Sequence, residues 1–189
     1  MRHSNKQVSP LFSIDEPAWF SRSMVYRYWL RRVVDEGHAG ERPCVWIMLN
    51  PSTATSTDND PTTRRCMGFA ERWGYTDHVA VNLFAFRSPE PDDLRSTMKD
   101  PIGRDNDAYI RRACKFANAR AVRSKRRGII VCAWGNGGFY MSRATEVLQL
   151  IHGYPVHCLG LNQTGEPRFP LYLPNATKPI RWRTNNVAL

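Results

Sequence analysis

The chain has 189 residues, a length that suits one domain with a sizeable hydrophobic core. Hydrophobic residues make up 42% of it, so we expect disorder only near its ends. Lysine and arginine number 27 against 17 acidic residues, which gives a net charge of +10. Such a surplus favours a polyanionic partner, with nucleic acid the commonest, although basic proteins without such a partner also exist.

Five cysteines are spread along the chain without a CxxC pair. Their odd count and wide spacing argue against a disulfide scaffold, a zinc site and an iron–sulfur cluster. No apolar stretch approaches the roughly 20 residues of a membrane span. The first ten residues, MRHSNKQVSP, lack the apolar core of a signal peptide. We therefore expect a cytoplasmic protein that binds no metal, no cofactor and no membrane.

The N-terminal part of the chain divides into an arm and a strand. Residues 1–22 are polar and contain prolines, and we expect a flexible arm there. Residues 24–37, MVYRYWLRRVVDEG, predict a strand with Tyr26, Tyr28 and Leu30 on one face. Its aromatic and basic residues interleave, which is typical of a nucleic-acid surface and equally of a half-exposed edge strand.

Four later segments are predicted strands with apolar residues on both faces. They are residues 44–50 (CVWIMLN), 78–86 (HVAVNLFAF), 126–138 (RRGIIVCAWGNGG) and 155–162 (PVHCLGLN). A continuous apolar pattern is typical of strands in a sheet that helices cover on both faces.

Three helices are predicted between these strands. The first begins with Asp60 as N-cap and Pro61 at the first helical position, and it ends at Gly74. The others lie in residues 100–122 and 141–153. This alternation predicts a three-layer α/β/α fold with a central, mainly parallel four-stranded sheet and an N-terminal antiparallel edge strand. We expect one domain over residues 23–184 and a short tail at 185–189.

Polar residues gather behind the predicted strands, at the edge where open α/β sheets bind ligands. The four loops concerned follow Asn50, Phe86, Trp134 and Leu161. They contain asparagines, hydroxyl residues, glycines and arginines but few acids or histidines. Such groups recognise amides and phosphates, and they do not suit a metal site or a serine–histidine pair.

Four of these segments resemble motifs of the uracil-DNA glycosylase superfamily, in the same order along residues 43–175. NPST followed by a helix ending in ERWGYTD is similar to the first motif, which reads GINPG in the mismatch-specific branch. VAVNLFAFRSPEP is similar to the strand whose asparagine reads the base edge, and IIVCAWGN to the next strand. PRFPLYL occupies the place of the loop that penetrates the minor groove. The chain resembles more closely still a bacterial and phage family of unknown activity with the signature MLNPSTA…DPT.RRC…NLFAFR.

This resemblance implies a DNA glycosylase, which flips a nucleotide into a pocket and cleaves its N-glycosidic bond. Because the transition state resembles an oxocarbenium ion, the enzyme needs an oriented water and donors aimed at the leaving base. We expect Asn50 to position the water, with Asp58 or Asp60 as the nearest carboxylate. The alternative is that Asn50 only ties down the turn before Pro51.

The resemblance also implies a base pocket and a DNA surface. We expect Asn82, Ser52 and Phe84 to contact the base, although a neighbouring loop could equally satisfy the Asn82 amide. Ser52 and its neighbours could instead cap a turn with their hydroxyls. Leu171 or Arg168 is expected to fill the gap left by the flipped base, unless Leu171 is ordinary core. The expected DNA contacts are Thr53, Arg87, Asn162, Arg168 and Leu171.

Small residues follow the motif proline in this chain. Uracil-specific members have a tyrosine there, which excludes bases with a 5-methyl group, whereas this chain has Ser52. We therefore expect a monomeric glycosylase for 5-substituted pyrimidines, such as hydroxymethylated or glycosylated bases of phage DNA, in repair or antiviral defence. The alternatives are a nucleotide- or base-modifying enzyme on the same fold and a non-catalytic nucleic-acid-binding module.

Overall fold

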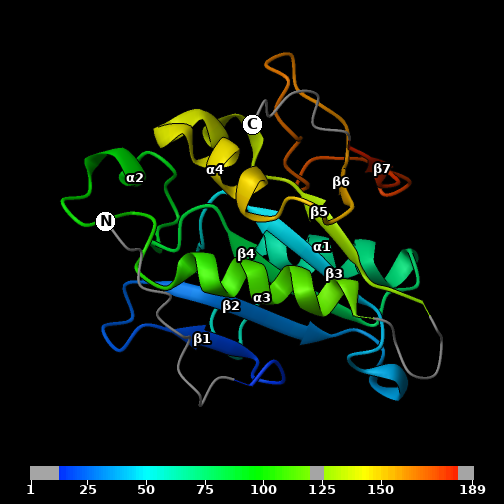
Figure 1. The fold of residues 1–189 in the computed structure, drawn as a ribbon. Coiled ribbons are helices and arrows are strands. Elements are labelled where there is room, and N and C mark those ends of the chain that lie inside the picture. Colours follow the sequence, from blue (N-terminus) through cyan, green and yellow to red (C-terminus); the bar gives the residue numbers. More distant parts are fainter. Residues whose placement is uncertain (1–12, 120–125, 183–189) are drawn as a thin grey trace.

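The computed structural model describes residues 13–119 and 126–182, in which seven strands form one mixed sheet (Figure 1). The sheet order is β1-β2-β4-β3-β5-β6-β7. The strands are β1 (Ala18–Phe20), β2 (Arg27–Val33), β3 (Pro43–Met48), β4 (Asp77–Asn82), β5 (Ile129–Cys132), β6 (Val156–Cys158) and β7 (Ile180–Arg181).

The four strands β4-β3-β5-β6 run parallel, which confirms the predicted α/β fold with a parallel centre. The antiparallel flanks are larger than expected. β2 pairs antiparallel with β4, and β1 pairs with the outer side of β2, so the predicted edge strand is not at the edge. At the other end β7 pairs antiparallel with β6. β1 lies within the expected N-terminal arm, and both added strands are too short to show a pattern of alternation.

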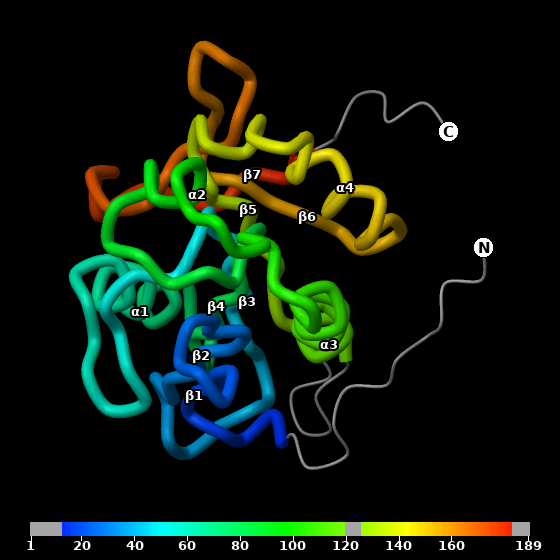
Figure 2. The backbone as a smooth tube through the Cα atoms, turned by 90° about the vertical axis from the view of Figure 1, so that its left-hand side faces the viewer, coloured from blue at the N-terminus to red at the C-terminus, as the bar shows by residue number. Residues whose placement is uncertain are grey.

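Helices cover both faces of the sheet, with α1 on one side and α3 on the other (Figure 2). The helices are α1 (Pro61–Arg72), α2 (Asp93–Ser96), α3 (Asn106–Asn118) and α4 (Arg143–Leu150), and short 3-10 segments occupy Glu36–His38 and Gly135–Ser142. α3 and α4 bury their apolar faces in the same core cluster. None of the helices in residues 13–119 and 126–182 is long and apolar enough to cross a membrane.

α1 begins and ends where its sequence signals predict. The Asp60 carboxylate accepts the Thr63 N–H at 2.7 Å, and Pro61 occupies the first helical position. Beyond the helix, Gly74 adopts φ +73°, a conformation that glycine reaches without a steric penalty. Between these ends Phe69 packs against Trp46 of β3, with ring centroids 6.2 Å apart.

α3 starts later than predicted, at Asn106, because Gly103 adopts φ +81° and interrupts the helical backbone before it. The first residue of α3 is tied to the sheet. The buried Asn106 amide donates to the carbonyl oxygens of Asn82 at 3.0 Å and Leu83 at 2.9 Å. These bonds satisfy backbone groups at the point where β4 ends. The structure thus joins the start of α3 to the carboxyl end of β4.

A β-bulge in β2 changes which side chains face each layer. The pairing with β1 matches Trp19 with Trp29 and Phe20 with Arg27, so Tyr28 is an extra residue. Tyr28 and Trp29 both join the core on the α3 side, whereas Leu30 joins the core on the α1 side. The prediction that Tyr28 and Leu30 share a face was wrong, because strict alternation ignores the bulge.

The interpretation of β2 as a nucleic-acid surface or half-exposed edge is also wrong. β2 lies between β1 and β4, and its first five residues are buried. Its aromatic rings pack inward, as Tyr28 does against Tyr109 of α3 with centroids 5.0 Å apart.

Candidate functional site

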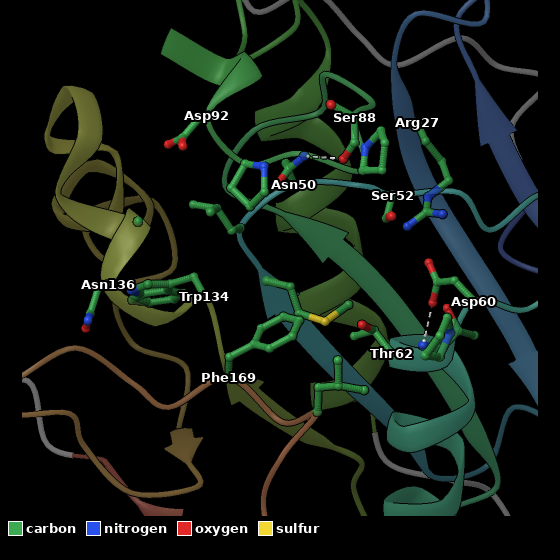
Figure 3. Close-up of a pocket in the computed structure, with 18 of the residues that line it drawn as sticks. Arg27, Asn50, Ser52, Asp60, Thr62, Ser88, Asp92, Trp134, Asn136 and Phe169 are labelled. Atoms are coloured by element: carbon green, nitrogen blue, oxygen red, sulfur yellow. Dashed lines mark hydrogen bonds between the residues drawn. The ribbon is translucent and has the colours of Figure 1, made fainter.

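The parallel strands leave a crevice at β3, where successive strands switch from one side of the sheet to the other. The chain goes from β3 to β4 on one side of β3, and later to β5 and β6 on the other, with the intervening helices on opposite faces. Ligands of open α/β sheets bind at such a switch point, outside the carboxyl ends of the strands. A cavity of about 690 Å³ opens there (Figure 3). Leu49 and Asn50 line it behind β3, and Trp134 and Gly137 line it behind β5.

The remaining walls come from the other strand ends and from α1. Ser88 contributes from the loop after β4, and Phe169 and Leu171 from the loop after β6. The first turn of α1 closes one side, and Arg27 of β2 reaches in between Ser52 and Asp60. All four loops that follow the parallel strands therefore meet at one cavity.

Asn50 joins two of these loops. Its Nδ2 donates to the Ser88 carbonyl at 3.0 Å and to the Pro51 carbonyl at 3.3 Å, while the Ser88 N–H donates to the Pro51 carbonyl at 2.9 Å. The amide is therefore fixed in orientation. Its Oδ1 has no hydrogen bond to any residue within the described ranges, and so remains able to accept one from a ligand or water. Asn50 thus both ties down the turn and lines the cavity.

The two aspartates near the first motif have different surroundings. Asp60 lines the cavity, but both its carboxylate oxygens accept backbone N–H groups, from Thr63 at 2.7 Å and Ala54 at 3.3 Å. Asp58 lies outside the cavity and is exposed, and its carboxylate accepts the Thr55 hydroxyl at 2.9 Å. Asp60 is thus a helix cap and loop anchor, and Asp58 is part of a surface turn.

Asn82 and Phe84 are buried and do not line the cavity. Asn82 is 1% exposed, and neither polar atom of its side chain has a hydrogen-bond partner among the described residues. Asn82 lies two residues after Ala80 in β4, so both side chains point to the α1 side of the sheet. It pairs in register with Met48 of β3. Phe84 is fully buried on the α3 side, where its ring lies 5.5 Å from that of Tyr140.

The expected DNA contacts divide between two cavities and the outer surface. Leu171 lines the main cavity beside Ser52, whereas Thr53 and Arg87 line a second cavity of about 350 Å³ that also includes Ser52. Asn162 and Arg168 line neither. The Asn162 amide donates to Asn136 Oδ1 at 2.9 Å, and Arg168 Nε donates to the Leu161 carbonyl at 3.1 Å.

Arg27 is the residue of the cavity that sequence reasoning missed. Its Nη1 donates to the Ala54 carbonyl at 2.9 Å. Burial lowers its pKa to about 10, an effect that Asp60 opposes and the nearby Arg87 and Arg32 reinforce. The guanidinium therefore stays charged at neutral pH. An arginine in an interior strand carries no signal of its own, and only the bulge at Tyr28 turns it toward the α1 side.

Two aromatic side chains, Trp134 and Phe169, form part of the cavity wall. In the sequence they are recognisable only as the end of a predicted strand and as part of a loop. Trp134 is buried and donates its Nε1–H to the Glu166 carboxylate, and burial raises the pKa of Glu166. Phe169, at the mouth, is partly exposed. Within the described ranges, no group of three or more histidine, cysteine or acidic residues could hold a metal ion. The cavity thus offers amide, hydroxyl, guanidinium and aromatic groups.

Comparison with known protein families assigns this chain to one of them. Residues 27–171 match DUF1643, described as a protein family of unknown function. The chain belongs to DUF1643. Comparisons with curated proteins and with solved structures found no match. The DUF1643 match begins at Arg27 and ends at Leu171, both of which line the cavity, and it includes every lining residue except Tyr172.

Proposed function

We propose that this DUF1643 protein is a DNA glycosylase that flips out and excises a 5-substituted pyrimidine. The observation that carries the proposal is the cavity at the switch point of the sheet, where a fixed asparagine, small hydroxyl residues and aromatic side chains face one space. A volume of about 690 Å³ falls in the range of small-molecule sites and accommodates a base with a bulky substituent. The likeness of its loops to uracil-DNA glycosylase motifs supports the same conclusion.

The apolar and polar sides of the cavity suit a nucleobase. A planar base needs apolar surface against its ring and hydrogen-bonding groups along its edge. Trp134, Leu49 and Phe169 supply the apolar side, and Asn50 and Ser52 the polar side. Ser52 projects little bulk into the cavity, which leaves room for a 5-substituent.

Asn50 is the proposed water-positioning residue. Its Nδ2 is held by the Ser88 carbonyl, so its Oδ1 accepts a hydrogen bond from the attacking water. An amide is not a general base, so either the bond breaks dissociatively or a carboxylate assists. Asp92 is the better candidate carboxylate, because it lines the cavity and is exposed, whereas the Asp60 oxygens are occupied by backbone N–H groups. Asp58 is outside the cavity and drops out of the proposed mechanism.

The rim of the cavity suits a DNA strand. Phe169, Leu171 and Tyr172 follow one another in a proline-containing loop, and Tyr172 is 90% exposed. An exposed apolar or aromatic wedge of this kind can replace the flipped base in the stack. Arg87 and Lys99 in the second cavity are placed to contact backbone phosphates, and the net charge of +10 favours the same partner.

A nucleotide-modifying enzyme is the second candidate, and the position of Arg27 favours it. A buried guanidinium inside the cavity suits a ligand that brings its own anionic group, as a free nucleotide does. Such an enzyme would not need the exposed wedge at the rim.

The deciding experiment incubates the protein with DNA strands and duplexes that carry uracil, mismatched thymine, hydroxymethylcytosine or glucosylated cytosine. Alkali then reveals abasic sites as strand breaks. We expect breaks at the 5-substituted cytosines, and none when Asn50 is replaced by alanine. The matched control Asn118→Ala, at the end of α3, should cleave like the wild type. Absence of abasic sites in every substrate would contradict the glycosylase proposal.

A further inference from the structure

Three arginines are almost fully buried in the described part of the chain, and two of them have carboxylate partners. Arg31 is 5% exposed and pairs with Asp77 at 2.7 Å and Asp15 at 2.6 Å. Arg143 is 3% exposed and pairs with Glu146 at 3.1 Å and with Asp107. A buried charge is stable only when it is paired in this way, because the protein interior solvates it poorly.

Arg27 breaks this pattern. It is 2% exposed, yet no carboxylate of the described residues lies within salt-bridge distance of it. Its only hydrogen-bond acceptor among the described residues is the neutral carbonyl of Ala54, and its Nε has no partner there. The guanidinium is thus a buried cation that no carboxylate of the described residues contacts directly.

Asp60 compensates the charge of Arg27 only in part. Its negative charge favours the Arg27 cation, but its two carboxylate oxygens are directed to the N–H groups of Thr63 and Ala54 and it forms no salt bridge with Arg27. Figure 3 shows the Arg27 side chain reaching into the space between Ser52 and Asp60. Because no carboxylate contacts the guanidinium, its Nε–H, which has no acceptor among the described residues, can donate to a ligand that enters the cavity.

The surroundings of Arg27 favour an anion. Thr62 and Thr63, in the first turn of the twelve-residue helix α1, line the same cavity, so the N-terminal end of the helix faces it. The Asp60 carboxylate already accepts the Thr63 N–H, which leaves the two threonine hydroxyls as the groups of this turn that can contact an anion. Ser52 offers a hydroxyl on the opposite side, and Arg95 adds a further positive charge at the rim. Guanidinium, hydroxyl and helix N-terminus together are the groups that hold phosphate in proteins.

We propose that Arg27 binds a phosphate group of the ligand inside the main cavity, with Ser52 and the first turn of α1 as the other contacts. The ligand is therefore a pyrimidine nucleotide and not a free base or nucleoside. This inference deepens the proposed function and rests on it for the pyrimidine ring, but not for the phosphate. The phosphate comes either from a free nucleoside monophosphate or from the backbone of a DNA strand.

The test measures binding by calorimetry for three ligands: deoxycytidine, deoxycytidine 5′-monophosphate and a short pyrimidine oligonucleotide without terminal phosphates. Each is titrated into the wild type, Arg27→Gln and the control Arg111→Gln, which removes the same charge from the exposed face of α3. We expect a phosphate-bearing ligand to bind about 10- to 100-fold more weakly to Arg27→Gln, as for loss of a charged hydrogen bond. Arg111→Gln should bind like the wild type.

The three ligands separate the sources of the phosphate. Loss of monophosphate binding in Arg27→Gln assigns the site to a free nucleotide, and loss of oligonucleotide binding alone assigns it to a strand. Equal affinities of Arg27→Gln and Arg111→Gln for both ligands would overturn the inference.

Two further measurements keep the test independent of the folding of Arg27→Gln. Inorganic phosphate should raise the melting temperature of the wild type above that in chloride at equal ionic strength, because it binds the folded state. Arg27→Lys, which keeps the charge but loses the planar fork, should retain part of that shift. No phosphate-specific shift in the wild type would overturn the inference. If the protein released no base but bound phosphate through Arg27, only the proposed glycosylase function would be contradicted.

Discussion

The side chain of Asn50 donates to the backbone carbonyl of Ser88 at 3.0 Å, across two loops that lie 38 residues apart in the sequence. The Ser88 N–H in turn donates to the carbonyl of Pro51 at 2.9 Å. This reciprocal pair holds the loops after β3 and β4 together and fixes the direction of the Asn50 amide. The orientation of the proposed water-positioning group is thus built into the fold before any ligand binds.

Replacing Asn50 with alanine should therefore separate catalysis from stability. We expect the rate of base release to fall by about 100-fold or more, as when one preorganised polar group is removed from an active site. The free energy of unfolding should fall by only about 1 kcal/mol, for the lost bond to Ser88. Single-turnover assays and urea denaturation of the variant measure the two quantities. Wild-type rates in Asn50→Ala would leave Asn50 with a purely structural role.

Ser52 should control which substituent the cavity accepts. Ser52→Tyr places a ring in the cavity, so we expect at least about 100-fold weaker cleavage of hydroxymethylated or glucosylated cytosine. Ser52→Ala should have a much smaller effect, since it adds no bulk. Ser56→Tyr is the matched control, because Ser56 lies in the same loop but is exposed and outside the cavity. Unchanged turnover in Ser52→Tyr would refute the assignment of this space to the 5-substituent.

Asp60 and Asp58 provide a test of helix capping. Asp60→Ala removes the acceptor of the Thr63 and Ala54 N–H groups, so the free energy of unfolding should fall by about 1 to 2 kcal/mol. Asp58→Ala, in the exposed turn, should stay within about 0.5 kcal/mol of the wild type. Asp60→Asn keeps an acceptor for the helix and should recover part of the loss. Equal effects of the two alanine variants in urea denaturation would contradict the capping role.

The buried charge of Arg27, which no carboxylate contacts directly, should lower the free energy of unfolding. Arg27→Met removes this cation, and the gain should offset the lost bond to Ala54, so we expect no loss of stability without ligand. Arg31→Met is the matched comparison, because it leaves the buried Asp77 without its partner. We expect that variant to lose about 3 kcal/mol or more. Thermal unfolding of both proteins checks the contrast, and similar losses would show that Arg27 is paired.

His78 should make the protein sensitive to acid. Burial lowers its pKa from 6.5 to about 3, with Arg27 and Arg32 adding to the effect and Asp60 opposing it. Between these values the unfolded chain binds a proton that the folded protein does not. The free energy of unfolding therefore falls as the pH drops below 6.5, by about 1.4 kcal/mol per pH unit for this group.

His78→Gln removes that dependence while keeping a polar side chain. Urea denaturation at several pH values between about 6.5 and 4.5 should show a shallower loss of stability for the variant than for the wild type. Parallel curves for the two proteins would mean that His78 can be protonated in the folded state.

The parallel centre of the fold could be predicted because its signals are local. Continuous apolar runs mark β3, β4 and β5, and the cap at Asp60 and the turn at Gly74 mark the ends of α1. β1 and β7 could not be predicted, because strands of three and two residues carry no periodicity and depend on pairing with distant segments.

The candidate site was predictable to the extent that it follows from strand ends. Asn50, Ser52 and Leu171 meet in one cavity because the carboxyl ends of parallel strands lie at one edge of the sheet. The same reasoning placed Asn82 in the cavity. Asn82 points to the α1 side, as Arg27 does, but it is buried and does not line the cavity. How deeply the last residue of a strand is buried depends on tertiary packing, which a local strand pattern does not show. Arg27 was not predictable, since the bulge that turns it inward leaves no mark in the sequence.

That bulge ties the chemistry of the cavity to the pairing of β2. If β2 paired regularly and kept Tyr28, alternation from Leu30 and Trp29 would direct Tyr28 to the α1 layer and Arg27 to the α3 layer. A relative with the same β2 residues but without the bulge would then present a phenol to the α1 layer in place of a guanidinium. Ligand preference among such proteins should therefore follow the register of this strand as closely as its composition.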